Sequence, residues 1–199
     1  MGYLAMKMME NKLFRPLIVD TNILQHLGNI ELGTQIIDRL RLALSKNYII
    51  SYSEYSILEM VDCASVEKEQ KRLNAIDWLI PYPVDKQTLI VAGHLGGLLQ
   101  EDGLSEKQQP EKGDKIIGAT SIIQNAIIYT TNGKDFPQPY FKEYSRHMLI
   151  FTKDKTQVCI MAYIIEPDRI AIRDRYNYRV KHSPKYQSML APANLISNI

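Results

Sequence analysis

The chain has 199 residues, of which 45% are hydrophobic and 23% are charged, a composition typical of a soluble globular protein with a full core. Its formal net charge of +2 is too small to indicate a partner. No apolar run is long enough to span a membrane and the segment from Met1 to Arg15 lacks the hydrophobic stretch of a signal peptide, so we expect a cytoplasmic protein with no membrane partner.

The first predicted element is a buried strand that follows Pro16 and runs from Leu17 to Asp20. The polar residues Thr21 and Asn22 come directly after it and indicate a turn. Open α/β sheets bind their ligands beyond the carboxyl ends of the strands. Asp20 is therefore predicted to lie where a ligand binds.

The middle of the chain alternates between helical and strand-like patterns. Helices are predicted at residues 32–45, from a cap at Ser53 with interruptions toward Trp78, at 84–99 and at 114–125, and strands at 48–51 and 126–130. Pro81 and Pro83 are expected to break a helix, and residues 102–113 are expected to form a loop. Apolar strands between helices predict a parallel sheet that helices cover.

After Pro137 the pattern becomes β-rich. Two apolar stretches at residues 148–152 and 158–165 are separated by a charged turn, which predicts a hairpin. The hairpin either extends the sheet or forms a small separate unit. We divide the chain into a domain at residues 1–136 and a C-terminal extension at residues 137–199.

Positive charge is concentrated in this extension. Between Asp168 and Lys185 there are six basic residues against two acidic ones, with three tyrosines in or next to the stretch. Basic side chains contact phosphates and tyrosines stack on unpaired bases, so one interpretation is an RNA-binding segment. A solvated surface strand or loop explains the same composition. The RNA-binding candidates here are Arg173, Arg175, Arg179 and Lys181.

Three further acids stand, like Asp20, near the boundaries of predicted elements. Glu59 lies about two turns into a helix, Asp114 starts a helix, and Asp135 follows a strand. Strand carboxyl ends and the following helix starts share one edge of a parallel sheet, so the four carboxylates are expected to converge. Clustered carboxylates repel one another and are tolerated mainly when they hold a cation, and oxygen ligands suit Mg²⁺ or Mn²⁺.

Each acid taken alone also has a structural explanation. Asp114 suits the first turn of a helix, Asp20 and Asp135 suit turns, and Glu59 suits a solvated helix face. Only the joint pattern favours a metal site. The side chains placed to orient the carboxylates are Thr21, Asn22, Thr130 and Asn132.

The same acids stand in four short motifs. These are Leu17–Asn22, then Ser53–Glu59 with the pattern Ser-x-x-Ser-x-x-Glu, then Asp114–Ser121, and finally Thr130–Phe136 with the pattern Thr-x-Asn-x-x-Asp-Phe. In this order they resemble the motifs of PIN-domain nucleases, especially the VapC-like toxins of toxin–antitoxin pairs. The resemblance covers roughly residues 15–136.

The resemblance implies a PIN-like three-layer α/β/α sandwich with a central, mainly parallel sheet, to which the β-rich extension is added. It also implies metal-dependent RNA cleavage, with Mg²⁺ or Mn²⁺ as cofactor and the catalytic, metal-binding residues Asp20, Glu59, Asp114 and Asp135. Glu54 and Glu59 are about 140° apart around a helix, so only one faces the site, and the motif register selects Glu59. A toxin role implies an antitoxin partner and a homodimer.

The long extension has no counterpart in compact members of the family. The alternative function is a non-catalytic RNA-binding or assembly module with the same fold. Lys115 and Lys134, next to two of the acids, either steer RNA or are solvated surface charges. Cys63 and Cys159 lie far apart, outside metal-ligand spacing, and are expected to be buried free thiols in a reducing compartment.

Overall fold

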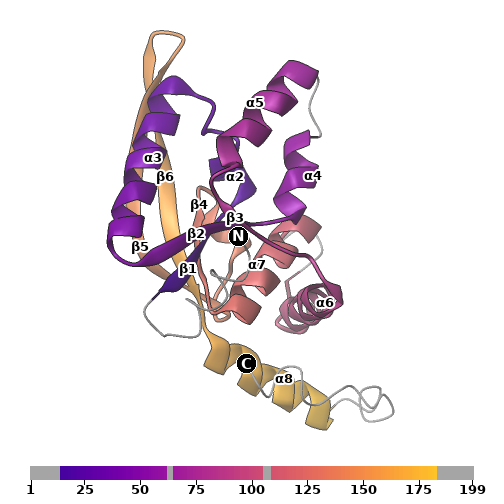
Figure 1. Cartoon of the computed structure of the whole chain (residues 1–199). Coiled ribbons are helices and arrows are strands. Elements are labelled where there is room, and N and C mark those ends of the chain that lie inside the picture. The colour runs from indigo at the N-terminus through magenta and orange to yellow at the C-terminus, as the bar shows by residue number, and fades with distance from the viewer. Residues whose placement is uncertain (1–13, 62–64, 105–108, 183–199) are drawn as a thin grey trace.

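The computed structural model describes residues 14–61, 65–104 and 109–182, and a six-stranded sheet forms its centre (Figure 1). The strands are β1 (Arg15–Val19), β2 (Tyr48–Ser53), β3 (Ile80–Tyr82), β4 (Ile127–Thr130), β5 (Phe141–Lys153) and β6 (Thr156–Pro167). Their order across the sheet is β3-β2-β1-β4-β6-β5. Strands β1, β2, β3 and β4 run parallel to one another. Strand β6 runs antiparallel to β4, and β5 runs antiparallel to β6.

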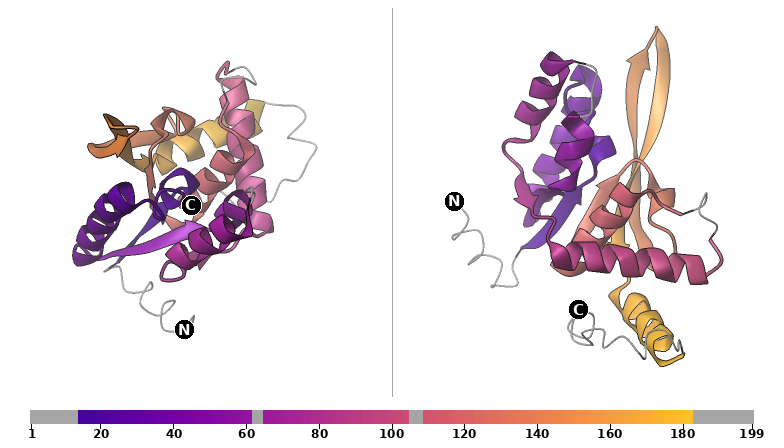
Figure 2. Two further views of the ribbon diagram at one scale, coloured as in Figure 1. Left: turned by 90° about the horizontal axis from the view of Figure 1, so that it is seen from above. Right: turned by 90° about the vertical axis from the view of Figure 1, so that its right-hand side faces the viewer.

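Helices pack on both faces of this sheet (Figure 2). They are α2 (Thr21–Leu24), α3 (Ile30–Ser45), α4 (Tyr55–Val61), α5 (Val66–Ile76), α6 (Lys86–Glu101), α7 (Lys112–Gln124) and α8 (Arg169–His182), and a short 3₁₀ turn, η1, spans Gly133–Asp135. The expected three-layer, mainly parallel α/β architecture is therefore confirmed. No helix in the described part of the chain has both the length and the apolar character needed to cross a membrane.

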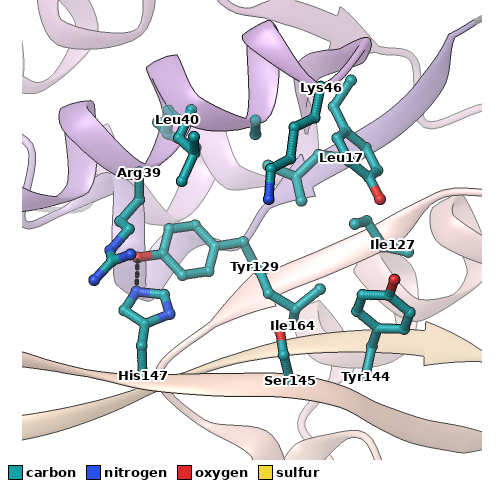
Figure 3. A pocket seen from close by; sticks show the side chains of 13 residues that line it. Leu17, Arg39, Leu40, Lys46, Ile127, Tyr129, Tyr144, Ser145, His147 and Ile164 are labelled. Carbon is teal, nitrogen blue, oxygen red and sulfur yellow. Dashed lines mark hydrogen bonds between the residues drawn. The ribbon is translucent and has the colours of Figure 1, made fainter.

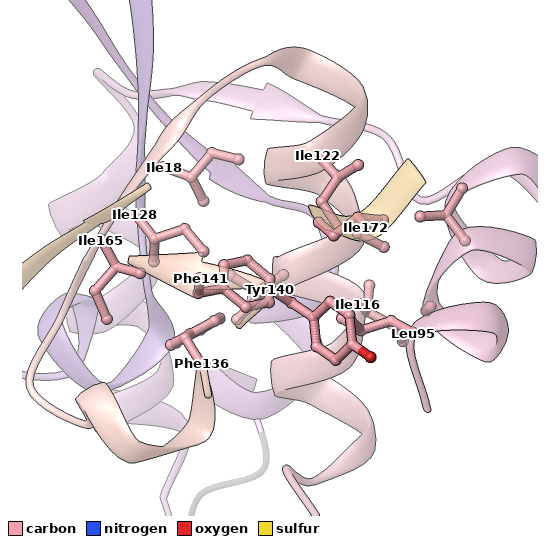
Figure 4. Close-up of a cluster of buried hydrophobic side chains, with 14 of the residues drawn as sticks. Ile18, Leu95, Ile116, Ile122, Ile128, Phe136, Tyr140, Phe141, Ile165 and Ile172 are labelled. Carbon is pink, nitrogen blue, oxygen red and sulfur yellow. The ribbon is translucent and has the colours of Figure 1, made fainter. Parts of the chain in front are cut away.

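Side chains on the two faces of the central strands belong to two separate hydrophobic clusters. Ile18 and Ile128 point into the cluster with α6 and α7 (Figure 4), whereas Leu17, Val19 and Ile127 point into the cluster with α2 and α3. Both faces of β1 and β4 are thus buried. This explains why these strands appear in the sequence as continuous apolar runs without alternation.

The predicted hairpin is present and extends the sheet. Strands β5 and β6 are joined by Asp154 and Lys155, both with positive φ, the conformation that a tight two-residue hairpin turn requires. Ile165 of β6 stands opposite Ile128 of β4, and both side chains belong to the same core cluster. The hairpin projects at one end of the molecule and α8 lies at the other (Figures 1 and 2). The division of the chain at residue 136 remains a prediction.

Several local expectations are wrong in informative ways. Pro81 does not simply break a helix; it lies in β3 at the edge of the sheet, where a residue without an N–H is tolerated. Ser53 ends β2 and is not a helix cap. The described part of the basic stretch, up to His182, forms helix α8 and is neither a strand nor a loop, and Lys185 lies outside the described residues. Cys159 is an exposed free thiol, and Cys63 lies outside the described residues.

Candidate functional site

The four predicted acids line one polar cavity of about 590 Å³ where β1 and β4 end. Asp20 follows β1, Glu59 lies in α4, Asp114 lies in the first turn of α7, and Asp135 ends η1. The other lining residues are polar or charged: Thr21, Asn22, Gln25, Gln109, Glu111, Asn132 and Lys134.

Asp20 is almost fully buried, with 2% of its surface exposed, and three donors hold its carboxylate. The Thr21 backbone N–H donates to Oδ1 at 2.7 Å, and the Thr130 hydroxyl donates to Oδ2 at 2.6 Å. The Asn22 amide also donates to Oδ2. Burial raises the pKa of Asp20 to about 6 and the nearby charge of Glu59 acts in the same direction, whereas the three hydrogen bonds oppose the rise.

Glu59 is fixed against the neighbouring elements. The Thr21 hydroxyl donates to its Oε2 at 2.5 Å and also lies 2.9 Å from the Ser56 hydroxyl. Its Oε1 packs against the start of α7 so closely that a Cβ on Gly113 would lie only 2.5 Å away. Glu59 lines the cavity and Glu54 is exposed outside it, in agreement with the motif register.

Asp114 lies in the first turn of α7, which begins two residues earlier than the sequence pattern indicates. Its Oδ2 accepts the Glu111 backbone N–H at 3.2 Å, as part of a reciprocal capping box. Burial is the largest cause that raises the pKa of Asp114, to about 7, and the charges of the other three acids raise it further. The Asp114 carboxylate is therefore close enough to the other three to be repelled by them.

Asp135 and the predicted supporting side chains form a connected network. The Asn132 amide donates to Asp135 Oδ2, and the Asn132 backbone N–H donates to the Thr130 hydroxyl at 2.9 Å. Asn22 accepts the Thr131 backbone N–H at 3.0 Å. Burial raises the pKa of Asp135, which the charge of Lys134 partly offsets.

The carboxylate oxygens of the cavity suit a hard cation that keeps several water ligands better than an ion enclosed by protein ligands alone. Among the described residues, no three carboxylate, imidazole or thiol side chains are arranged closely enough to hold a metal. Mg²⁺ keeps several water ligands and is commonly bound through only one or two carboxylates. A polar cavity whose acids are held by neighbouring donors and repel one another matches that requirement.

The predicted basic residues are placed differently from one another. Lys134 lines the acidic cavity, whereas the Lys115 ammonium, outside the lining, donates to Gln109 Oε1 at 3.1 Å. No residue of α8 lines the cavity. The candidates on α8 are Arg173, which pairs with Asp174; Arg175, which pairs with Asp102; Arg179, which pairs with Glu101; and Lys181, in the last turn.

Sequence reasoning did not find Gln25, Gln109 or Glu111 in the lining. Glu111 carried a usable signal, because an acid three residues before another acid at a helix start is the spacing of a capping box. Gln25 and Gln109 lie in segments without a distinguishing pattern.

No family model matches the sequence, and no curated protein matches it. Among solved structures, the chain is similar to the crystal structure of VapBC2 from Rickettsia felis bound to a DNA fragment from their promoter. The TM-score is 0.52 and the identity is 24%, over 61% of this chain and 90% of that chain. This likeness shows that the chain has a PIN-like fold.

Proposed function

We propose that this chain is a metal-dependent endoribonuclease that hydrolyses RNA phosphodiester bonds with Mg²⁺ or Mn²⁺. The observation that carries the proposal is the convergence of four acids, from four separate segments of the chain, on one open polar cavity. Keeping carboxylates together costs free energy unless a cation compensates their repulsion. The PIN-like fold of the neighbouring structure agrees with this assignment.

The chain's own residues hold and orient the reacting groups. Asp20, Glu59, Asp114 and Asp135 are the proposed metal-binding residues, of which one or two would contact an ion directly and the others would act through its water ligands. Thr21, Asn22, Thr130 and Asn132 keep three of these carboxylates in fixed orientations. A bound Mg²⁺ or Mn²⁺ would supply an activated water and neutralise charge on the phosphodiester. Lys134, an exposed cation on the lining, is placed to contact an RNA phosphate.

The proposal extends to a toxin role in a toxin–antitoxin pair. The neighbouring structure is a complex of VapBC2 with promoter DNA. An antitoxin that covers the acidic cavity would place a cation, such as an arginine, among the four carboxylates. A homodimer is part of the same proposal.

The proposed ligands are tested by charge-neutral substitutions. We expect Asp20→Asn and Asp114→Asn to lower the cleavage of single-stranded RNA in Mn²⁺ by more than about 100-fold while circular dichroism shows an intact fold. Glu59→Gln should act in the same way, and Glu54→Gln, five positions away and exposed, is the matched control. Calorimetry with Mn²⁺ alone, without RNA, reports on metal binding separately from catalysis.

Two results would overturn the assignment. Full cleavage by both Asp20→Asn and Asp114→Asn would exclude these acids as ligands. RNA binding by the wild-type protein without cleavage in Mn²⁺ would instead favour the non-catalytic module, and loss of that binding in Arg173→Gln and Lys181→Gln would locate the RNA on α8.

A further inference from the structure

A second cavity, of about 230 Å³, lies between helix α3 and the base of the β5–β6 hairpin (Figure 3). Helix α3 contributes Arg39 and its C-cap residue is Lys46, strand β4 contributes Tyr129, and strand β5 contributes Tyr144 and His147. The rest of the described lining is mainly apolar and consists of Leu17, Leu40, Leu42, Ala43, Tyr48, Ile127 and Ile164, together with Ser145. No lining residue is shared with the acidic cavity, so the two sites are separate.

The charge of this cavity is not balanced. Among the residues of the lining that the structure describes, Arg39 and Lys46 are the two permanent cations and there is no carboxylate. Within the described ranges, neither cation makes an ion pair, whereas Arg41 on the same helix pairs with Asp38 at 3.4 Å. Unneutralised cations beside a concave apolar surface attract an anion.

His147 does not add to this positive charge. Its pKa is lowered, first by burial and then by the charge of Arg39, so the imidazole is neutral near pH 7. Its Nε2 lies 3.0 Å from the hydroxyl of the buried Tyr129, and the two rings are stacked with centroids 5.5 Å apart. Figure 3 shows the Arg39 and Lys46 heads on either side of the Tyr129 ring. The cavity thus has two cationic ends and an aromatic base.

A β-bulge adds a third tyrosine to the lining, after Tyr48 and Tyr129. The register of β5 against β6 shifts between Glu143 and Ser145, so Tyr144 is an extra residue in its strand. Tyr144 and Ser145 consequently both line the cavity, although strand alternation would turn one of them away. Bulges of this kind redirect side chains beside binding sites. Tyr144 is 65% exposed and is therefore available to a ligand.

We propose that this cavity binds a small organic phosphate with a flat ring, of the nucleoside monophosphate class. Arg39 and Lys46 bind the phosphate oxygens, since a guanidinium makes paired charge-assisted hydrogen bonds to phosphate and an ammonium adds a point charge. Tyr129 and Tyr144 contact the ring. The volume is below the roughly 300 to 1,000 Å³ of common ligand pockets, which favours a mononucleotide over a longer chain.

The test is titration calorimetry of the full chain, in EDTA, with AMP, GMP, CMP and UMP as probes. We expect at least one nucleotide to bind, and to bind at least about tenfold more tightly than inorganic phosphate or its own nucleoside. Arg39→Gln and Lys46→Gln should each weaken binding at least about tenfold, because each removes a charged hydrogen-bond donor. Tyr144→Ala should also weaken it.

Matched controls separate this site from the acidic one. Arg41→Gln removes a cation from the same helix outside the cavity and should leave the affinity unchanged. Asp114→Asn alters the acidic cavity and should also leave nucleotide affinity unchanged in EDTA. These binding measurements do not depend on RNA cleavage. The nucleotide site can therefore be confirmed or rejected even if the proposed nuclease activity is absent.

Three outcomes would overturn the inference. The first is the absence of binding by all four nucleotides at millimolar concentration. The second is an affinity that both Arg39→Gln and Lys46→Gln leave unchanged in folded protein. The third is inorganic phosphate binding as tightly as the nucleotides, because the ring would then contribute nothing.

Discussion

The hydroxyl of Thr130 donates a 2.6 Å hydrogen bond to Oδ2 of Asp20, and both side chains are buried. Asp20 directly follows β1 and Thr130 ends the neighbouring parallel strand β4. The same hydroxyl accepts the Asn132 backbone N–H. Thr130 therefore both orients the first carboxylate and anchors the turn that carries Asp135. It contributes to the site although it is not itself a proposed ligand.

Replacement of Thr130 by valine removes this donor and acceptor with almost no change of shape. We expect Thr130→Val to lower Mn²⁺ affinity by about 10- to 100-fold and stability by about 1 to 3 kcal/mol, because buried polar groups lose their partner. Calorimetry and urea unfolding measure the two effects. Thr34→Val on the exposed face of α3 is the control for the substitution itself. Unchanged Mn²⁺ affinity in Thr130→Val would show that Asp20 does not need this hydrogen bond.

Gly113 permits the close approach of α4 to α7. A Cβ there would lie 2.5 Å from Glu59 Oε1 and 2.7 Å from Tyr55 Cε1, so Gly113→Ala must displace the carboxylate. We expect RNA cleavage to fall on the order of 100-fold, as misplacement by about 1 Å can cause. Gly93→Ala, in the exposed part of α6 with no atom within 4 Å, should instead stabilise the protein by about 0.5 to 1 kcal/mol. Equal effects of the two changes on cleavage would contradict this account.

Helix α3 protects the outer edge of the sheet. The Gln35 side chain donates to the Ile150 carbonyl and accepts the Ile150 backbone N–H at 3.1 Å. Edge strands with unpaired backbone groups exchange hydrogen and recruit other strands. We expect Gln35→Ala to speed hydrogen exchange at Ile150 about tenfold, equivalent to about 1.4 kcal/mol. Gln70→Ala, on the exposed surface of α5, should leave this exchange unaltered.

Asp168 couples β5 to the start of α8 in a pH-dependent way. Its Oδ1 accepts the Ala171 backbone N–H at 3.0 Å and its Oδ2 pairs with Lys142, and these contacts lower its pKa below the usual value. The lowered pKa means that the stabilisation is present above about pH 4 and is lost as the pH falls through the folded-state pKa. Asp168→Ala should therefore cost about 1 kcal/mol at pH 7 and progressively less below pH 4, as measured by denaturant unfolding.

The control for Asp168 is Asp174→Ala, an exposed acid on the same helix that pairs only locally with Arg173. Surface pairs of this kind contribute little, so its effect should be small at every pH. A deficit in Asp168→Ala that stays constant from pH 7 to about pH 2.5 would rule out the ionised carboxylate as its origin.

Short sequence patterns predicted the strands and turns that carry Asp20 and Asp135, because a buried strand and the turn after it are each defined by neighbouring residues. The buried run Leu17–Val19 and the turn after Thr130 are visible in the sequence, and the expected convergence of their acids follows from a parallel sheet. Strand β3 could not be predicted, because a three-residue strand containing Pro81 has no periodicity. It is defined by pairing with β2, far from it in the sequence.

Helix α8 and the second cavity also depend on distant contacts. Only Ile172 and Tyr176 are buried in α8, so its apolar face is too narrow to stand out among the arginines. The ion pairs of Arg175 and Arg179 require α6 to pass beside α8. The cavity of Arg39 and His147 exists only where α3 meets β5, a contact that joins residues as distant as Gln35 and Ile150, 115 positions apart.

The pairing that brings Thr130 to Asp20 joins residues 110 positions apart, and it sets an order of events during synthesis. Contacts over such separations close late in folding. At roughly 5 to 20 residues per second, on the order of 10 s pass between the appearance of Asp20 and that of Thr130 at the ribosome. A nascent chain therefore carries an incomplete acidic cavity throughout this interval, and any activity of that cavity begins only after β4 has been made.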